Sequence, residues 1–161
     1  MADPIIRVEV GTAPFDVAAE TALLTAGSDD VGAVVSFVGL CRSEGGRLAA
    51  LELEHYPGMT EAEITRIARE AADRWRLAGV TVIHRVGRLV PGDPIVLALT
   101  ASAHRAAALE AASFLMDYLK TSAPIWKKEH FADGSPPRWV EPRASDDAAL
   151  LRWREEPPLR G

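Results

Sequence analysis

Hydrophobic and polar residues alternate along several short segments of the chain, which is the pattern of a strand with one buried face. In the segment 50–55, for example, Leu51 and Leu53 alternate with glutamates. The continuous apolar run at 33–38 instead predicts a buried strand. The predicted strands cover residues 5–10, 33–38, 50–55, 80–85, 95–101, 125–131 and 138–141.

Apolar residues recur every three or four positions in the segment after residue 60, which predicts an amphipathic helix. Thr60 and Glu63 have the spacing of a capping box at its start, and Gly79 suits its C-terminal end. Two shorter helices are predicted at 17–24, capped by Asp16, and from Ser145 to Trp153.

A second long helix is predicted between Ser102, which can cap it, and Lys120. It cannot continue past Pro124, because proline lacks an N–H group and clashes with the preceding turn. The residues expected on its buried face are Leu109, Ala112, Met116 and Leu119.

The order of these elements mixes strands with two long helices and contains neither repeats nor a linker. This order favours an α+β domain, or a variant of an α/β layer, with a mixed or antiparallel sheet. A chain of 161 residues is most simply one domain with a substantial core. We therefore expect a single domain at 1–154 and a loose C-terminal tail at 155–161.

The composition is that of an ordinary soluble globular protein, with 48% apolar and 25% charged residues. The net charge of −5 gives no general attraction to nucleic acid or to an anionic membrane. No apolar run is long enough to span a bilayer, and the N-terminus lacks the layout of a signal peptide, so a cytoplasmic protein is expected.

Metal and cofactor sites find little support in the sequence. The single Cys41 excludes an internal disulfide and a multi-cysteine metal site. The four histidines lack the spacing of a helical metal site, so no metal or cofactor is expected. A lone cysteine at a strand end is more often a small apolar filler than a nucleophile or a persulfide carrier. A strand histidine such as His84 is more often packed or hydrogen-bonded than a metal ligand.

All three lysines of the chain lie in the segment DYLKTSAPIWKKEH (117–130), whereas the other fifteen basic residues are arginines. Arginine is effectively always protonated, but a lysine near other cations gives up its proton more easily and can act as a general acid or base. Lys120 ends the second long helix, and in an extended segment Lys127 and Lys128 point to opposite faces. The clustering therefore indicates a catalytic role, although three surface lysines placed by chance would give the same pattern.

Further cations are candidates for binding an anion. His104 and Arg105 fall in the opening turn of the second long helix, where free N–H groups and the helix dipole attract negative charge. Arg42 follows a predicted strand and opens a glycine-rich turn, which is a common place for ligand contacts. The alternative is that all three side chains extend into solvent.

Six segments of the chain occur in the order found in one protein family. They are GAVVSFVGLCR (32–42), LELEHYPGMTE (51–61), VTVIHRVGRLVPGD (80–93), SAHR (102–105), DYLKTSAPIWKKE (117–129) and RWVE (138–141). Over residues 3 to 154 the chain resembles the large, catalytic subunit of molybdopterin synthase. The resemblance implies an α+β fold of the α/β-hammerhead type. It also implies a sulfurtransferase of molybdenum cofactor biosynthesis that converts cyclic pyranopterin monophosphate to molybdopterin.

The same resemblance implies a partner protein and an oligomer. In this family each of the two dithiolene sulfurs comes from a small ubiquitin-like subunit, which carries it as a thiocarboxylate on its C-terminal Gly-Gly tail. Two large subunits form a homodimer with one small subunit at each outer end, which makes a heterotetramer. No nucleic acid or membrane partner is expected, because the net charge is −5.

The motif positions imply individual roles for the basic residues. Lys120 matches the family's essential lysine close to the partner's tail, and Lys127 matches its second active-site lysine. The residues that match a basic pocket for the substrate's phosphate and pterin are Arg42, His104 and Arg105, with Arg138 and Arg143 near that pocket. Arg143 is also a candidate to reach in from the other subunit of the dimer.

We therefore hypothesise that Lys120 is a general acid/base or positions the tail, with Lys127 as its electrostatic partner and Lys128 facing solvent. Pro124 would end the helix so that the chain swings Lys127 back toward Lys120. Two other functions stay open. One is a non-catalytic module that docks a ubiquitin-like tail, and the other is a phosphate-ester hydrolase, which lacks an evident metal site or nucleophile–base pair.

Overall fold

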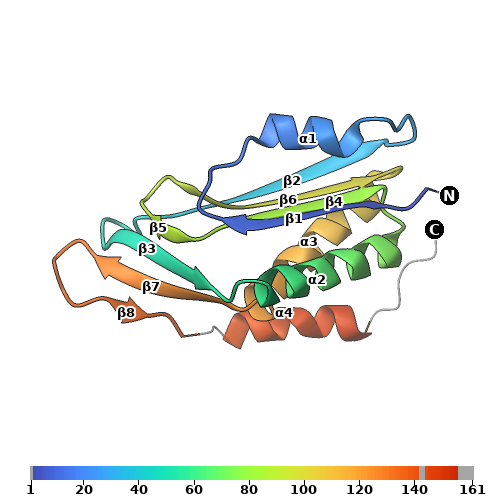
Figure 1. Cartoon of the computed structure of the whole chain (residues 1–161). Helices are drawn as coiled ribbons and strands as arrows, with labels where there is room; N and C mark the ends of the chain where they lie inside the picture. Colours follow the sequence, from blue (N-terminus) through green and yellow to red (C-terminus); the bar gives the residue numbers. More distant parts are fainter. Residues whose placement is uncertain (1, 142–143, 156–161) are drawn as a thin grey trace.

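The structure, a computed structural model, describes residues 2–141 and 144–155 (Figure 1). The described residues form four helices and eight strands. The helices are α1 (Val17–Thr25), α2 (Met59–Trp75), α3 (Arg105–Thr121) and α4 (Ala144–Glu155). The strands are β1 (Ile5–Gly11), β2 (Ala33–Leu40), β3 (Leu48–His55), β4 (Gly79–Arg85), β5 (Gly87–Leu89), β6 (Pro94–Ser102), β7 (Ile125–Phe131) and β8 (Arg138–Trp139).

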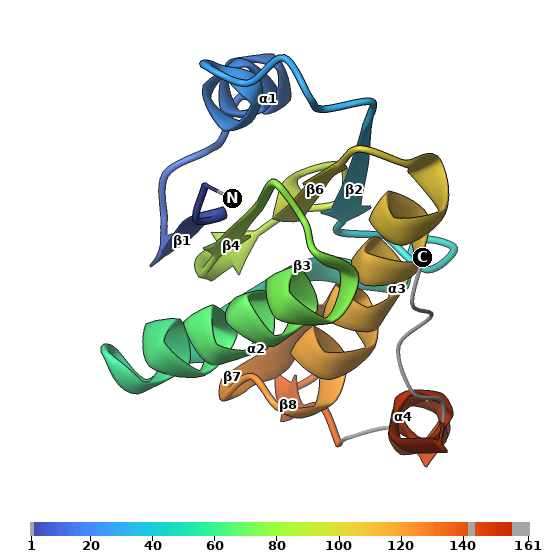
Figure 2. The same ribbon diagram turned by 90° about the vertical axis from the view of Figure 1, so that its right-hand side faces the viewer.

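The strands form two four-stranded sheets, which we call sheet A and sheet B. Sheet A has the order β1-β4-β6-β2, in which β1 and β4 are parallel and the other pairs are antiparallel. Sheet B has the order β5-β3-β7-β8, and all its pairs are antiparallel. Helix α1 covers one face of sheet A, and α2 and α3 cover the other (Figure 1; Figure 2). The α+β fold expected from the sequence is therefore confirmed.

The main core lies between sheet A and helices α2 and α3. Ile64 and Ile67 of α2 and Phe114 of α3 are fully buried there. Helix α4 packs against α3, and its Trp153 ring meets the Phe114 ring edge-on with 5.5 Å between the ring centres. Each fully buried side chain of this size contributes about 1.5–3 kcal/mol, so α3 is held firmly under the sheet.

The prediction of a buried strand at 33–38 is wrong. Among the strands that the structure describes, β2 is at the edge of sheet A and pairs only with β6. Its side chains Val34, Val38 and Leu40 are 36%, 36% and 53% exposed, and we call these three residues the β2 strip. An apolar run buries a strand only where other elements cover it, and β2 has a neighbouring strand on one side alone.

Both ends of α2 differ from the prediction. Its N-cap is Gly58, whose N–H donates to the Glu61 carboxylate at 2.6 Å, so the expected box of Thr60 and Glu63 does not form. Thr60 lies inside the first turn, where its hydroxyl has other partners. The C-cap is Arg76 in the left-handed conformation, with φ of 51°, and Gly79 already begins β4.

The remaining differences concern element ends. Helix α3 begins at Arg105 after His104 as N-cap residue, because Ser102 still belongs to β6. On the predicted inner face of α3, Ala112 and Leu119 are buried but Leu109 is exposed. Helix α4 begins at Ala144 with Ser145 inside it, and the short strand β5 has no counterpart among the predicted elements.

The division into a domain at 1–154 and a tail at 155–161 stays a prediction, because residues 156–161 lie outside the described residues. In the part of the chain that the structure describes, no helix combines the length and the apolar character needed to cross a membrane.

Candidate active site

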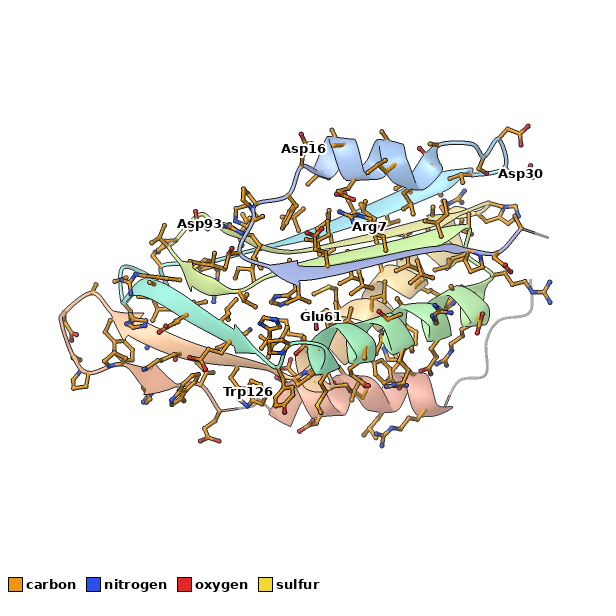
Figure 3. All side chains as sticks on the ribbon, in the orientation of Figure 1. Arg7, Asp16, Asp30, Glu61, Asp93 and Trp126 are labelled. Carbon is orange, nitrogen blue, oxygen red and sulfur yellow. The ribbon has the colours of Figure 1, made fainter. Side chains whose placement is uncertain are left out.

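The ends of α3, β3 and β4 meet the start of β7 where sheet A adjoins sheet B, and we call this region the junction (Figure 1). A turn containing Pro124 joins α3 to β7, and a second turn joins β3 to α2. Thr60 ties the two turns together, because its buried hydroxyl donates to the Pro124 carbonyl at 3.0 Å and accepts from the Tyr56 N–H at 3.0 Å. Figure 3 labels Glu61, in the first turn of α2, and Trp126, in β7, on this side of the molecule. The segment that links the two candidate lysines is thus fixed against α2.

Lys127 and Lys128 lie on opposite faces of sheet B, which confirms the prediction from strand geometry. Lys127 pairs with the buried Leu53, so its side chain shares the inner face of the sheet. Lys128 pairs with Glu52 on the outer face, and its Nζ lies 5.4 Å from the centre of the Trp139 ring. Of these two lysines, Lys127 therefore faces the junction.

Lys120 lies in the last turn of α3 and is exposed, so the partial burial expected for it is not found in the single chain. The positive charge of Lys120 affects the pKa of His84, whose buried imidazole lies near the end of β4. Burial above all, and then the positive charges of Lys127 and Lys120, lower the pKa of His84 to about 4. Both positive charges therefore act on the same imidazole. The expected return of Lys127 toward Lys120 stays a prediction.

Arg138 lies on the same face of sheet B as Lys127. It pairs with Glu129 across β7 and β8, which places it diagonally from Lys127. Its guanidinium group lies 5.8 Å from the centre of the Phe131 ring. Arg143, the other C-terminal arginine expected near the pocket, lies outside the described residues.

Cys41 and Arg42 follow β2 at the end of sheet A that adjoins sheet B. The Cys41 side chain is buried, its Sγ lies 3.8 Å from the Leu89 carbonyl oxygen, and burial raises the pKa of its thiol. A buried, protonated thiol is a poor nucleophile, which favours the interpretation of Cys41 as an apolar filler. The Arg42 side chain is exposed at this end of the sheet.

His104 and Arg105 lie at the opposite end of α3 from Lys120. The sixteen residue steps from His104 to Lys120 correspond to about 24 Å along a helix axis. Figure 1 shows α3 running under sheet A from the end of β6 to the junction. One chain therefore brings Lys120 and Lys127 to the junction, places Arg138 further along sheet B, and leaves His104 and Arg105 at the far end of sheet A.

His84 and His55 belong to the junction, although the family resemblance implies no role for either residue. His55 ends β3, and its Nε2 lies 3.5 Å from a carboxylate oxygen of Glu61. His84 follows Val80 and Val82 at two-residue intervals, and both valines pack on the side of α2 and α3. That period is the signal in the sequence that places His84 on the helix side of sheet A. Among the residues described, no three His, Cys, Asp or Glu side chains are grouped so as to hold a metal ion.

Comparison with known proteins points to one family. The MoaE protein family matches residues 10–122. The molybdopterin synthase catalytic subunit of Mesorhizobium japonicum is 63% identical over 151 residues, which is 94% of each chain. Among solved structures, the molybdopterin biosynthesis MoaE protein from Burkholderia ambifaria has a TM-score of 0.80 at 48% identity and covers 94% of this chain and 100% of its own. A complex of subunits 1 and 2 of the molybdopterin-converting factor from Helicobacter pylori has a TM-score of 0.68 at 20% identity, covering 86% of this chain and 91% of its own, and shows a likeness of fold alone. The chain therefore belongs to the MoaE family of molybdopterin synthase catalytic subunits.

Proposed function

We propose that the junction is the sulfur-transfer site at which cyclic pyranopterin monophosphate becomes molybdopterin. Through its family the chain is a catalytic subunit in molybdenum cofactor biosynthesis, and the proposal concerns where and how the reaction proceeds. One observation carries it: Lys120 ends α3, Lys127 lies on the inner face of sheet B, and Thr60 ties the turn between them to α2. Arg138, a diagonal neighbour of Lys127, adds a further positive charge.

The charges of the reactants explain why such a cluster is needed. The cyclic phosphate and the thiocarboxylate are both anionic, so their repulsion would oppose contact in water. Clustered cations offset that repulsion and stabilise the charge that develops as the phosphate ring opens. We assign Lys127, on the inner face of sheet B, the role of fixed electrostatic partner. Lys120, exposed at the end of α3, is accessible to a partner's tail and acts as general acid/base or positions that tail.

We infer that two copies of the chain complete each pocket. The family resemblance implies that His104 and Arg105 bind the substrate beside Lys120, yet about 24 Å along α3 separates the two ends of the helix. A second copy can supply both cations, which supports a homodimer within a heterotetramer. The β2 strip offers an exposed apolar edge suited to contact with that copy. Arg42 and Arg143 belong to the same proposed pocket.

The small ubiquitin-like partner is proposed to dock beside the junction. The structurally similar Helicobacter pylori protein was solved as a complex of two subunits. In this chain Tyr56, Met59 and Trp126 are exposed around the two connections at the junction, and aromatic residues and Met are enriched where proteins bind one another. A partner resting there would bring its C-terminal Gly-Gly thiocarboxylate to Lys120. The cytoplasmic location expected from the sequence is part of this proposal.

The test combines the purified chain, a thiocarboxylated small subunit and cyclic pyranopterin monophosphate, and measures molybdopterin. Lys120→Arg keeps the charge but removes the proton that is easily transferred, so we expect a loss of about a hundredfold or more. Lys128→Arg, on the outer face of the same strand, is the matched control and should retain wild-type activity. No molybdopterin from the wild type would refute the proposed function. Near-normal activity of Lys120→Arg would refute the acid/base role and favour tail positioning.

A further inference from the structure

Helix α4 is fastened to α3 through the side chain of Asp117, which lies one turn before Lys120. The indole Nε1–H of Trp153 donates to Oδ2 of Asp117 at 2.7 Å. Nη2 of Arg152 donates to the same oxygen at 3.3 Å and to the Ser113 hydroxyl at 2.7 Å. Two neighbouring residues of α4 therefore hold one carboxylate oxygen of α3.

The Trp153 side chain is fixed by more than this hydrogen bond. It is 6% exposed, and its ring meets the rings of Trp75 and Phe114 edge-on, with 5.5 Å between ring centres in both pairs. Its backbone carbonyl accepts from Nη2 of Arg74 at 2.7 Å. Contacts from α2 and α3 thus aim the indole N–H at Asp117. Phenylalanine at position 153 would keep the ring packing and lose only the donor.

Lys120 is the other cation within reach of the Asp117 carboxylate. Residues three apart on a helix are neighbours on its surface, and opposite charges at this spacing attract each other. Among the described residues, however, the ion pair of Asp117 is with Arg152, and Lys120 forms none. The Asp117 side chain is only 24% exposed, so water and salt would screen a pair with Lys120 incompletely. Such a pair would neutralise a charge that two anionic reactants require.

We propose that α4 restrains Asp117, with Trp153 as positioning residue, and thereby keeps this carboxylate from pairing with Lys120. Arg152 supports the same restraint from the surface of α4. The ammonium group of Lys120 is then left to the substrate and to the partner's tail. This consequence for catalysis rests on the proposed function of Lys120. The restraint of Asp117 does not, and it can be tested without turnover.

The first test uses the fact that the chain has only three lysines. Lysine-selective isotope labelling gives side-chain NMR signals from these residues alone, with Lys128 on the outer face of sheet B as internal control. In the double variant Trp153→Phe with Arg152→Met, Asp117 is released, so we expect the Lys120 signals to move. Adding Asp117→Asn should return these signals to their position in Asp117→Asn alone. Unmoved Lys120 signals in the folded double variant would overturn the proposal, as would equal movement with asparagine at 117. If the double variant does not fold, Trp153→Phe alone replaces it.

The second test measures molybdopterin synthesis. In the double variant we expect kcat to fall between about threefold and tenfold, and Asp117→Asn in the same chain should recover most of the loss. A helix that only stabilises the fold would give a loss that Asp117→Asn leaves in place, and this result would overturn the proposal. The control Arg154→Met removes an exposed arginine of the same helix and should leave kcat unchanged. If the wild type makes no molybdopterin, the proposed function fails while the NMR comparison still decides whether α4 restrains Asp117.

Discussion

Replacing Thr60 with valine should loosen the junction while nearly keeping the size of the buried side chain. Valine has nearly the size of threonine but no hydroxyl, so the Pro124 carbonyl and the Tyr56 N–H both lose their partner. A buried polar group without a partner costs about 1–3 kcal/mol, and because water reaches part of these two turns we expect a total loss of about 2 kcal/mol. For a chain of this size, that loss lowers Tm by roughly 4–8 °C.

Urea unfolding at pH 7, monitored by tryptophan fluorescence, measures this loss of unfolding free energy directly. The matched control is Thr65→Val, because the Thr65 hydroxyl donates at 2.7 Å to the Glu61 carbonyl within the same helix, and its loss should cost less than about 0.5 kcal/mol. Thr60→Ser retains the hydroxyl and should keep wild-type kcat, whereas Thr60→Val should lose kcat because the segment between the two lysines shifts. Equal losses of unfolding free energy in Thr60→Val and Thr65→Val would refute the reasoning.

Three further predictions follow from burial and exposure. His84 has a lower pKa in the folded chain, about 4, than its ordinary value of 6.5, so its contribution to stability is complete above pH 6.5. As pH falls from 6.5 to 4 the fold should lose up to about 3 kcal/mol in denaturant titrations, and His84→Gln should show a flatter pH dependence; equal slopes would contradict the assignment. Cys41→Ser should retain most activity when thiocarboxylated partner is supplied, and complete loss would restore the persulfide hypothesis. Val38→Glu in the β2 strip should convert dimers to monomers in sedimentation velocity, with Leu151→Glu at an exposed apolar position of α4 as control; an unchanged dimer would place the interface elsewhere.

The parts of the site that depend on residues close together in the sequence could be predicted from it. The opposite faces of Lys127 and Lys128 follow from strand geometry, and Pro124 ends α3 through its own ring. The distance from His104 to Lys120 also follows from helix length alone. Matching of motifs nevertheless placed both residues in one pocket, because a motif does not say which copy of a chain supplies a side chain.

Features that depend on distant partners could not be predicted. Thr60 has the sequence context of a helix cap, but the carbonyl that it binds lies 64 residues further along the chain. The run at 33–38 is apolar, yet its exposure is decided by the order of strands in sheet A. The strand period places His84 on the helix side, but its low pKa depends on burial and on charges from β7 and α3.

The length of α3 has a genetic consequence. In a two-fold dimer whose pockets each combine Lys120 of one copy with His104 of the other, a Lys120→Ala copy and a His104→Ala copy place both defects in the same pocket. The second pocket of that mixed dimer is then intact. Random pairing makes half of the dimers mixed, so co-expression of the two inactive alleles should restore about a quarter of wild-type molybdopterin synthesis. Two alleles that each abolish the cofactor would thus complement one another, which a pocket built from a single chain does not allow.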